Sequence, residues 1–177
     1  MMQIVFIGCR DIDKRVGGIE SYMKSLLEVL KRRDDVEAIL YEGSDVDEKR
    51  IDKNITYIKF KVTSNKYLNK LLIGKVSTRR AMKEYPNADI YHYNANIAGL
   101  FSYIPLRKNK KVVFEGHGFE WKRAKWNPII RKLNKMVDDF VLGRNKNILM
   151  CSQEQVDYVN ENYPGKHIMA APTGVDL

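Results

Sequence analysis

The sequence has few of the residues that mark disulfide-rich, metal-binding and membrane-spanning proteins. It contains two cysteines, Cys9 and Cys151, and three histidines among 177 residues. Each cysteine lies in a short apolar stretch, which favours buried thiols in a reducing, cytoplasmic compartment over a disulfide framework. The cysteines and histidines form no closely spaced pairs, so we expect no metal site. Neither a run of about 18 apolar residues nor a basic leader occurs, which argues against a transmembrane helix and an export signal.

Acidic residues are fewer than basic ones. The 31 Lys and Arg residues exceed the 22 Asp and Glu residues and give a formal net charge of +9. An excess of this size favours a polyanionic partner such as nucleic acid, a phosphorylated ligand or an anionic membrane. Hydrophobic residues make up 44% of the chain, with only 11 glycines and 5 prolines, which excludes disordered and low-complexity classes. The length predicts one domain over residues 1–177.

Short apolar segments alternate with amphipathic segments along the chain. Strands are predicted at 4–7, 36–41, 55–60, 89–93, 111–115, 147–151 and 166–170. Helices are predicted at 19–30, 66–84, 97–103, 127–142 and 153–162. Ser152 and Gln155 form a capping-box pattern at the start of the last helix. The alternation predicts an α/β fold, with a doubly wound, mostly parallel sheet and helices on both faces.

The loop after the first strand ends in two glycines. Gly17 and Gly18 stand directly before a helix that carries Glu20 in its first turn. Glycines at a helix N-terminus let backbone N–H groups approach a phosphate, although a plain turn has the same composition. The chain lacks G-x-G-x-x-G and G-x-x-x-x-G-K-[ST], which argues against ordinary dinucleotide and P-loop sites.

Two later loops carry polar side chains at strand ends, where ligands bind in sheets of this kind. Asn94 and Asn96 are candidates for hydrogen bonds to a hydroxylated ligand, or else cap the turn and helix that follow. We interpret His92 as a strand histidine with satisfied hydrogen bonds. His117 lies between two glycines, which favours ligand contact over core packing. Glu120 either orients the ligand or stays solvated.

Two tracts, 66–83 and 121–136, combine basic and apolar or aromatic residues. Such surfaces suit the headgroup region of an anionic membrane, whereas ordinary helices with solvated lysines explain each tract separately. The candidates for membrane contact are Lys70, Lys75, Arg79, Arg80, Lys122, Arg123 and Trp126.

Four segments occur in a recognisable order: VGGIE at 16–20, DIYH at 89–92, EGHGFEWKRAKW at 115–126 and PTGVD at 172–176. Together they resemble the N-terminal half of a retaining family-four glycosyltransferase with the GT-B fold, and the resemblance covers the whole chain. Thr173 stands where this family usually has Asn. The third segment is similar to that of a rhamnosyltransferase-like subgroup, which builds bacterial capsule, O-antigen or exopolysaccharide repeats.

The resemblance implies a Rossmann-like, acceptor-side domain that works with a C-terminal donor-binding domain absent from this chain. Catalysis by the chain alone is therefore not expected. Gly17 and Gly18 would approach the diphosphate of a nucleotide-sugar donor, and His117 would be the catalytic-site residue near the transferred sugar and the acceptor hydroxyl. No metal or other cofactor is implied. A polyprenyl-diphosphate-linked sugar would be the acceptor, met at the inner face of the cytoplasmic membrane where the basic tracts dock.

Two other functions stay open on the sequence alone. The chain is alternatively a non-catalytic basic module that binds nucleic acid, although no zinc-finger, RNP or helix-turn-helix pattern supports that function. It is also compatible with a membrane-associated partner of a separately encoded catalytic chain.

Overall fold

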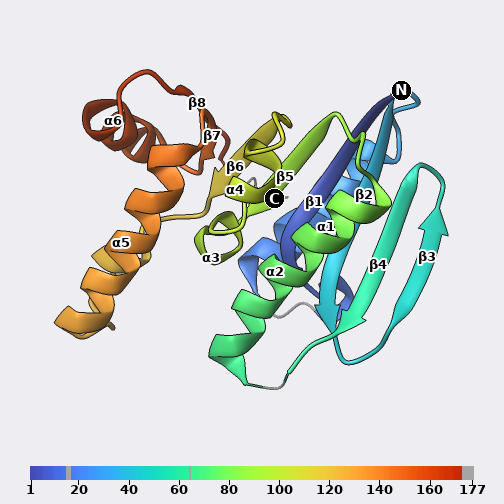
Figure 1. The fold of residues 1–177 in the computed structure, drawn as a ribbon, viewed down its shortest axis with the longest axis horizontal. Coiled ribbons are helices and arrows are strands. Elements are labelled where there is room, and N and C mark those ends of the chain that lie inside the picture. Colours follow the sequence, from blue (N-terminus) through green and yellow to red (C-terminus); the bar gives the residue numbers. More distant parts are fainter. Residues whose placement is uncertain (15–16, 64, 173–177) are drawn as a thin grey trace.

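One mixed β-sheet forms the centre of the structure (Figure 1). In the computed structural model, which describes residues 1–14, 17–63 and 65–172, eight strands lie in the order β3-β4-β2-β1-β5-β6-β7-β8. They are β1 (Met2–Arg10), β2 (Val36–Ser44), β3 (Glu48–Asp52), β4 (Ile55–Lys61), β5 (Ile90–Asn94), β6 (Val112–Gly116), β7 (Asn147–Met150) and β8 (His167–Ala170). Among these neighbours only β3 and β4 are antiparallel. The predicted mostly parallel sheet is confirmed.

Strand β1 lies at the centre and is buried on both faces. Val5 packs into the core on one side of the sheet and Phe6 into the core on the other. A strand covered on both faces is apolar along its length, which explains why the sequence shows it clearly. A Cβ atom at Gly8 would lie 2.2 Å from the carbonyl oxygen of Asn94, so glycine permits the close approach of β1 and β5. The strand order reverses between β1 and β5, where a ligand crevice is expected.

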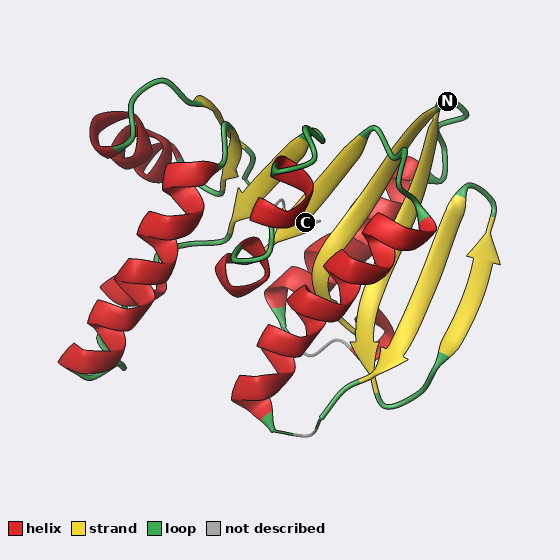
Figure 2. Cartoon of the chain, viewed as in Figure 1, coloured by secondary structure: helices red, strands yellow, loops and turns green. Residues whose placement is uncertain are grey.

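Helices cover both faces of the sheet (Figure 2). The helical segments of the described residues are η1 (Ile12–Lys14), α1 (Gly18–Leu30), α2 (Lys66–Glu84), α3 (Asn96–Gly99), α4 (Tyr103–Leu106), η2 (Glu120–Lys122), α5 (Pro128–Arg144) and α6 (Gln153–Asn162). Helix α1 buries Met23 and Leu27 against one face, and α2 buries Ile73 and Ala81 against the other. The doubly wound arrangement predicted from the sequence is therefore confirmed.

The start of α6 follows the predicted cap with one difference. The Ser152 hydroxyl accepts a hydrogen bond from the Gln155 N–H, as predicted. The Gln155 side-chain oxygen, however, accepts from the Cys151 N–H at 3.2 Å and not from the residue that caps the helix. This bond ties the end of β7 to the first turn of α6.

Two segments differ from the prediction. Strand β3 was not predicted because its five residues are mostly charged and exposed, as edge strands often are. The single helix predicted at 97–103 is instead the two short helices α3 and α4. Between the two helices the N–H groups of Phe101 and Ser102 bond to the carbonyls of Ala98 and Gly99, three residues back, in place of the i→i−4 bonds of an α-helix.

Candidate active site

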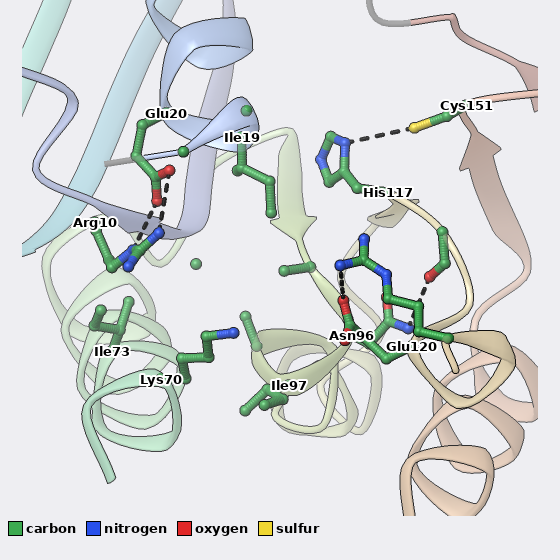
Figure 3. A pocket seen from close by; sticks show the side chains of 17 residues that line it. Arg10, Ile19, Glu20, Lys70, Ile73, Asn96, Ile97, His117, Glu120 and Cys151 are labelled. Carbon is green, nitrogen blue, oxygen red and sulfur yellow. Dashed lines mark hydrogen bonds and ion pairs between the residues drawn. The ribbon is translucent and has the colours of Figure 1, made fainter. Parts of the chain in front are cut away.

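A cavity of about 460 Å³ opens at the carboxyl ends of β1, β5, β6 and β7 (Figure 3). It lies at the reversal of strand order, where the fold predicts a ligand site. The predicted site residues that line it are Gly17, Gly18, Asn96, His117 and Glu120. Two residues predicted for membrane contact, Lys70 and Arg123, also line it.

The first turn of α1 faces this cavity. Gly17 caps the helix in an extended conformation, and a Cβ atom there would lie 2.9 Å from Oε2 of Glu20. A Cβ atom at Gly18 would have no neighbour within 4 Å among the described residues, which leave the helix start open on that side. The N-terminus of a 13-residue helix carries partial positive charge and free N–H groups. The site can therefore accept an anionic group.

An ion pair flanks the helix start. Arg10, at the end of β1, donates from Nε to Oε1 of Glu20 at 2.9 Å. The Glu20 side chain is almost fully buried, whereas about a third of the Arg10 side chain is exposed, and both residues line the cavity. Arg10 was not among the site residues predicted from the sequence. Its position directly after an apolar strand was the available signal, since strand ends converge on the crevice.

His117 lies in the loop after β6, between two glycines with different constraints. A Cβ atom at Gly116 would lie 2.7 Å from the sulfur of Met150, and Gly118 has a φ of +120°. The imidazole is half-buried, and its Nδ1 lies 3.6 Å from Sγ of Cys151. Burial lowers the pKa of His117, an effect that the nearby Glu115 carboxylate only partly offsets. The imidazole is therefore neutral at pH 7.

A buried pair joins the two strands that end at the cavity, β5 and β6. His92 Nε2 and Glu115 Oε2 lie 2.9 Å apart, and both side chains are buried. Burial alone would raise the pKa of Glu115, but the contacts with His92, His117 and Tyr22 lower it overall. The interpretation of His92 as a satisfied strand histidine is confirmed.

Cys151 differs from the expectation of two buried thiols. Cys9 is fully buried, but Cys151 is half-buried and lines the cavity. The difference arises because Cys151 directly follows β7, at the sheet edge where the cavity opens. Burial, together with the Glu115 charge, raises the pKa of the Cys151 thiol, so the sulfur carries its proton at neutral pH.

The two asparagines are placed differently. Asn96 lines the cavity and donates a short hydrogen bond to Oδ1 of Asp138 on α5. Asn94 is fully buried, does not line the cavity, and its side-chain amide has no hydrogen-bond partner among the described residues. The pKa of Asp138 is raised to about 7. Burial is the main cause, and the hydrogen bond from Asn96 acts in the opposite direction. Asp138 was not predicted as a site residue, because its burial depends on the packing of α5 against α3.

Glu120, the first residue of η2, is bonded on several sides while about a third of its side chain stays exposed. It accepts a hydrogen bond from the Trp126 indole at 3.0 Å and forms ion pairs with Arg123 at 3.1 Å and Lys125 at 3.8 Å. These contacts join the two ends of the loop that follows His117. Trp126 is thereby half-buried, and Lys122 is engaged with Glu154 and the aromatic rings around Tyr158.

Helix α2 presents its cations in two directions. Lys70 projects toward the cavity (Figure 3) and has no ion-pair partner in the part of the chain that the structure describes. Lys75 and Arg79 are exposed. Arg80 pairs with Glu84 at 2.8 Å and packs against a tyrosine ring. Of the four cations predicted for membrane contact on this helix, Lys75 and Arg79 are therefore the exposed ones that form no ion pair with another described residue.

The described residues offer neither a metal site nor a membrane-spanning helix. Within residues 1–14, 17–63 and 65–172 no cluster of His, Cys, Asp and Glu side chains is arranged to hold a metal ion. No helix in the same ranges has the length and apolarity to cross a membrane. Val16 of the first resembling segment and residues 173–176 of the last lie outside the described residues.

The chain belongs to glycosyltransferase family 4, whose family model matches residues 16–177. No curated protein matches the chain. Among solved structures, sucrose-phosphate synthase from Thermosynechococcus elongatus is similar, with a TM-score of 0.71 at 13% identity over 99% of this chain and 49% of the synthase.

Two ligand-bound structures share the same fold. The catalytic domain of starch synthase IV from Arabidopsis thaliana, bound to ADP and acarbose, has a TM-score of 0.62 at 10% identity over 99% of this chain and 52% of that domain. A structure from E. coli, described as trehalose-6-phosphate bound with UDP-2-fluoro glucose, has a TM-score of 0.65 at 14% identity over 99% and 49%. The chain spans about half the length of these structures and has the fold of the N-terminal half of GT-B proteins.

Proposed function

We propose that this chain is the acceptor-side half of a retaining, nucleotide-sugar-dependent glycosyltransferase. The observation that carries the proposal is the composition of the cavity walls. The N-terminus of α1, Arg10 and Lys70 all line the cavity, and backbone N–H groups and cationic side chains of this kind bind diphosphates. His117 and Asn96 line the same cavity and suit the hydroxyls of a sugar. Family membership and the nucleotide and sugar bound in two similar structures support this assignment.

The proposed roles follow from these positions. The backbone around Gly17 and Gly18 approaches the donor diphosphate, and His117 contacts the transferred sugar beside the acceptor hydroxyl. The departing phosphate takes the acceptor proton, so the protein contributes positioning and charge stabilisation and needs neither a dedicated base nor a metal. A C-terminal donor-binding domain completes the cleft. The half-length overlap with the similar structures supports that division.

Substitution of His117 tests this function. In the full-length enzyme we expect His117→Ala to lower sugar transfer at least about tenfold, the scale of about 1.4 kcal/mol in the barrier. His167→Ala is the matched control, because His167 is exposed on β8 and does not line the cavity. Transfer from a panel of nucleotide sugars to a polyprenyl-diphosphate-linked sugar is the assay. Equal turnover of wild type and His117→Ala would remove His117 from the mechanism.

The finer assignment is a rhamnosyltransferase-like enzyme of bacterial cell-surface polysaccharide synthesis that docks peripherally on the cytoplasmic face of the membrane. Exposed apolar residues beside the basic ones support docking, and they are Leu68 and Leu71 on α2 with Ile129, Leu133 and Met136 on α5. A dTDP-rhamnose donor that outperforms glucose and galactose donors would support the sugar assignment. Equal or better transfer from the other donors would contradict it.

Vesicle binding tests the membrane assignment separately. We expect co-sedimentation with anionic vesicles and not with zwitterionic ones, weakened in a Lys75→Gln/Arg79→Gln variant. Lys108→Gln/Lys111→Gln removes equal charge from exposed lysines that lie outside both basic tracts, just before the start of β6, and should bind as wild type does. Tighter binding to nucleic acid than to vesicles, with a steep salt dependence, would favour the basic-module alternative.

A further inference from the structure

We propose that Cys151 is a positioning residue that fixes the tautomer of His117 and leaves Nε2 of the imidazole as a hydrogen-bond acceptor. The group that His117 meets is then a donor, a sugar hydroxyl, and not a carbonyl or phosphate oxygen. This inference rests on the proposed function for its ligand. The tautomer itself can be measured without any activity.

The contacts of the Cys151 sulfur favour one arrangement of hydrogens. Sγ lies 3.4 Å from the carbonyl oxygen of Gly116 and 3.6 Å from Nδ1 of His117. A carbonyl oxygen can only accept, and the protonated thiol has one hydrogen, so the S–H group donates to Gly116. The sulfur then presents lone pairs to His117, and Nδ1 must carry the hydrogen of that contact. A thiol turned toward Nδ1 would leave the shorter sulfur–oxygen contact without a hydrogen.

The second ring nitrogen independently indicates the same tautomer. Nε2 of His117 is buried and has no hydrogen-bond partner among the described residues. A buried N–H group without an acceptor is rarer in proteins than an under-satisfied acceptor, because the lost hydrogen bond is costly. Placing the hydrogen on Nδ1 gives it an acceptor in the sulfur and leaves Nε2 bare.

The surroundings hold the sulfur and the imidazole in this relation. The Cys151 N–H is bonded to the side chain of Gln155, which fixes the residue at the start of α6. Gly116 packs tightly on Met150, so β6 and β7 cannot separate freely beneath His117. The Tyr22 ring of α1 meets the imidazole edge-on at 5.6 Å between centroids. Nε2 is buried in this structure, so a hydroxyl reaches it only after a local rearrangement around the imidazole.

Histidine ¹⁵N NMR of the chain at pH 7.5 tests the tautomer. We expect a protonated-type shift at Nδ1 of His117 and an unprotonated-type shift at Nε2. Cys151→Ala should give averaged shifts from mixed tautomers, and Cys151→Ser, which retains a donor and lone pairs, should restore the wild-type pattern. His92 and His167 report in the same spectra that the fold is intact, and Cys9→Ala controls for loss of a thiol. A protonated Nε2 in wild type, or unchanged shifts in Cys151→Ala, would overturn the proposal.

Transfer by the full-length enzyme tests the positioning role. Cys151→Ala should lower kcat about fivefold, the scale of one hydrogen bond, with rescue by Cys151→Ser. Equal kcat for Cys151→Ala and wild type would overturn the positioning role. Failure of the proposed function has a different signature, because the predicted tautomer and its dependence on Cys151 would persist while His117→Ala left transfer unchanged.

Discussion

Asp138 provides a direct test of the electrostatics beside the cavity. Its side chain is almost fully buried on α5, with one oxygen accepting from Asn96 and the other, Oδ2, without a partner among the described residues. Burial raises the pKa of Asp138 to about 7 from 3.8, with smaller contributions from the Asp139 and Glu120 charges. Replacing Asp138 with Asn removes the ionisable group and keeps an oxygen for Asn96.

The sign and size of the effect follow from the raised pKa. The folded state holds this proton more tightly than the unfolded state, so stability falls as the pH rises from the unfolded value of 3.8 through the folded value of about 7. Between pH 5.5 and 8.5 the loss from this group is about 2 kcal/mol, since one pKa unit corresponds to about 1.4 kcal/mol. Asp138→Asn should lose about 2 kcal/mol less than wild type over this interval, and should be the more stable protein at pH 8.5.

Urea unfolding followed by circular dichroism at pH 5.5 and 8.5 measures both quantities. Asp139→Asn is the matched control on the adjacent position. Partial burial raises the pKa of Asp139, but bonds from Lys135 and Tyr163 lower it overall, so this carboxyl is ionised throughout the interval. The Asp139 carboxyl does not titrate in this interval, so Asp139→Asn should keep most of the wild-type pH dependence and reduce it only by the smaller contribution that the Asp139 charge makes to the pKa of Asp138. The reasoning is refuted if Asp138→Asn shows the same pH dependence as wild type.

Two further predictions concern thiol access and backbone conformation. A thiol reagent should label Cys151 in the native chain and Cys9 only after unfolding, because Cys9 is fully buried. Peptide mass spectrometry identifies the labelled cysteine, and labelling of Cys9 in the native chain would contradict the fold. Gly118→Ala should cost about 1–3 kcal/mol in urea unfolding because its φ is +120°. Gly143→Ala, on α5 with open space around the added methyl group, should instead stabilise by about 0.5–1 kcal/mol, and equal effects of the two changes would contradict the assigned backbone.

The elements that were predicted correctly are those whose burial follows from the local spacing of apolar residues. Helix α2 spans 66–84 and α6 spans 153–162, as predicted, because their apolar positions recur at helical spacing. Strand β1 was recognisable because both of its faces are buried. Strand β3 carries no such pattern, since its stability comes from pairing with β4 and not from burial of its own side chains.

The same distinction separates the predicted site residues from the missed ones. Gly17, Gly18 and His117 could be predicted because they follow parallel strands, and the ends of such strands meet at one edge of the sheet. The contact of Cys151 with His117 depends on the register between β6 and β7, which pairs Gly116 with Met150. No local sequence pattern encodes that register, so Cys151 was predicted to be a buried thiol like Cys9.

The charged residues around the cavity show where part of the positive net charge could act on a ligand. Of its two carboxylates, Glu20 is engaged by Arg10 and Glu120 by Arg123, so neither opposes a ligand freely. Lys70 has no ion-pair partner among the described residues and adds its charge beside the positive end of α1. That balance favours an anionic ligand such as a phosphate group. Membrane contact would instead use the exposed cations of the outer surface. The basic residues of α2 thus face two different surfaces. Substitution of Lys70 should weaken phosphate binding, whereas substitution of Lys75 and Arg79 should weaken vesicle binding.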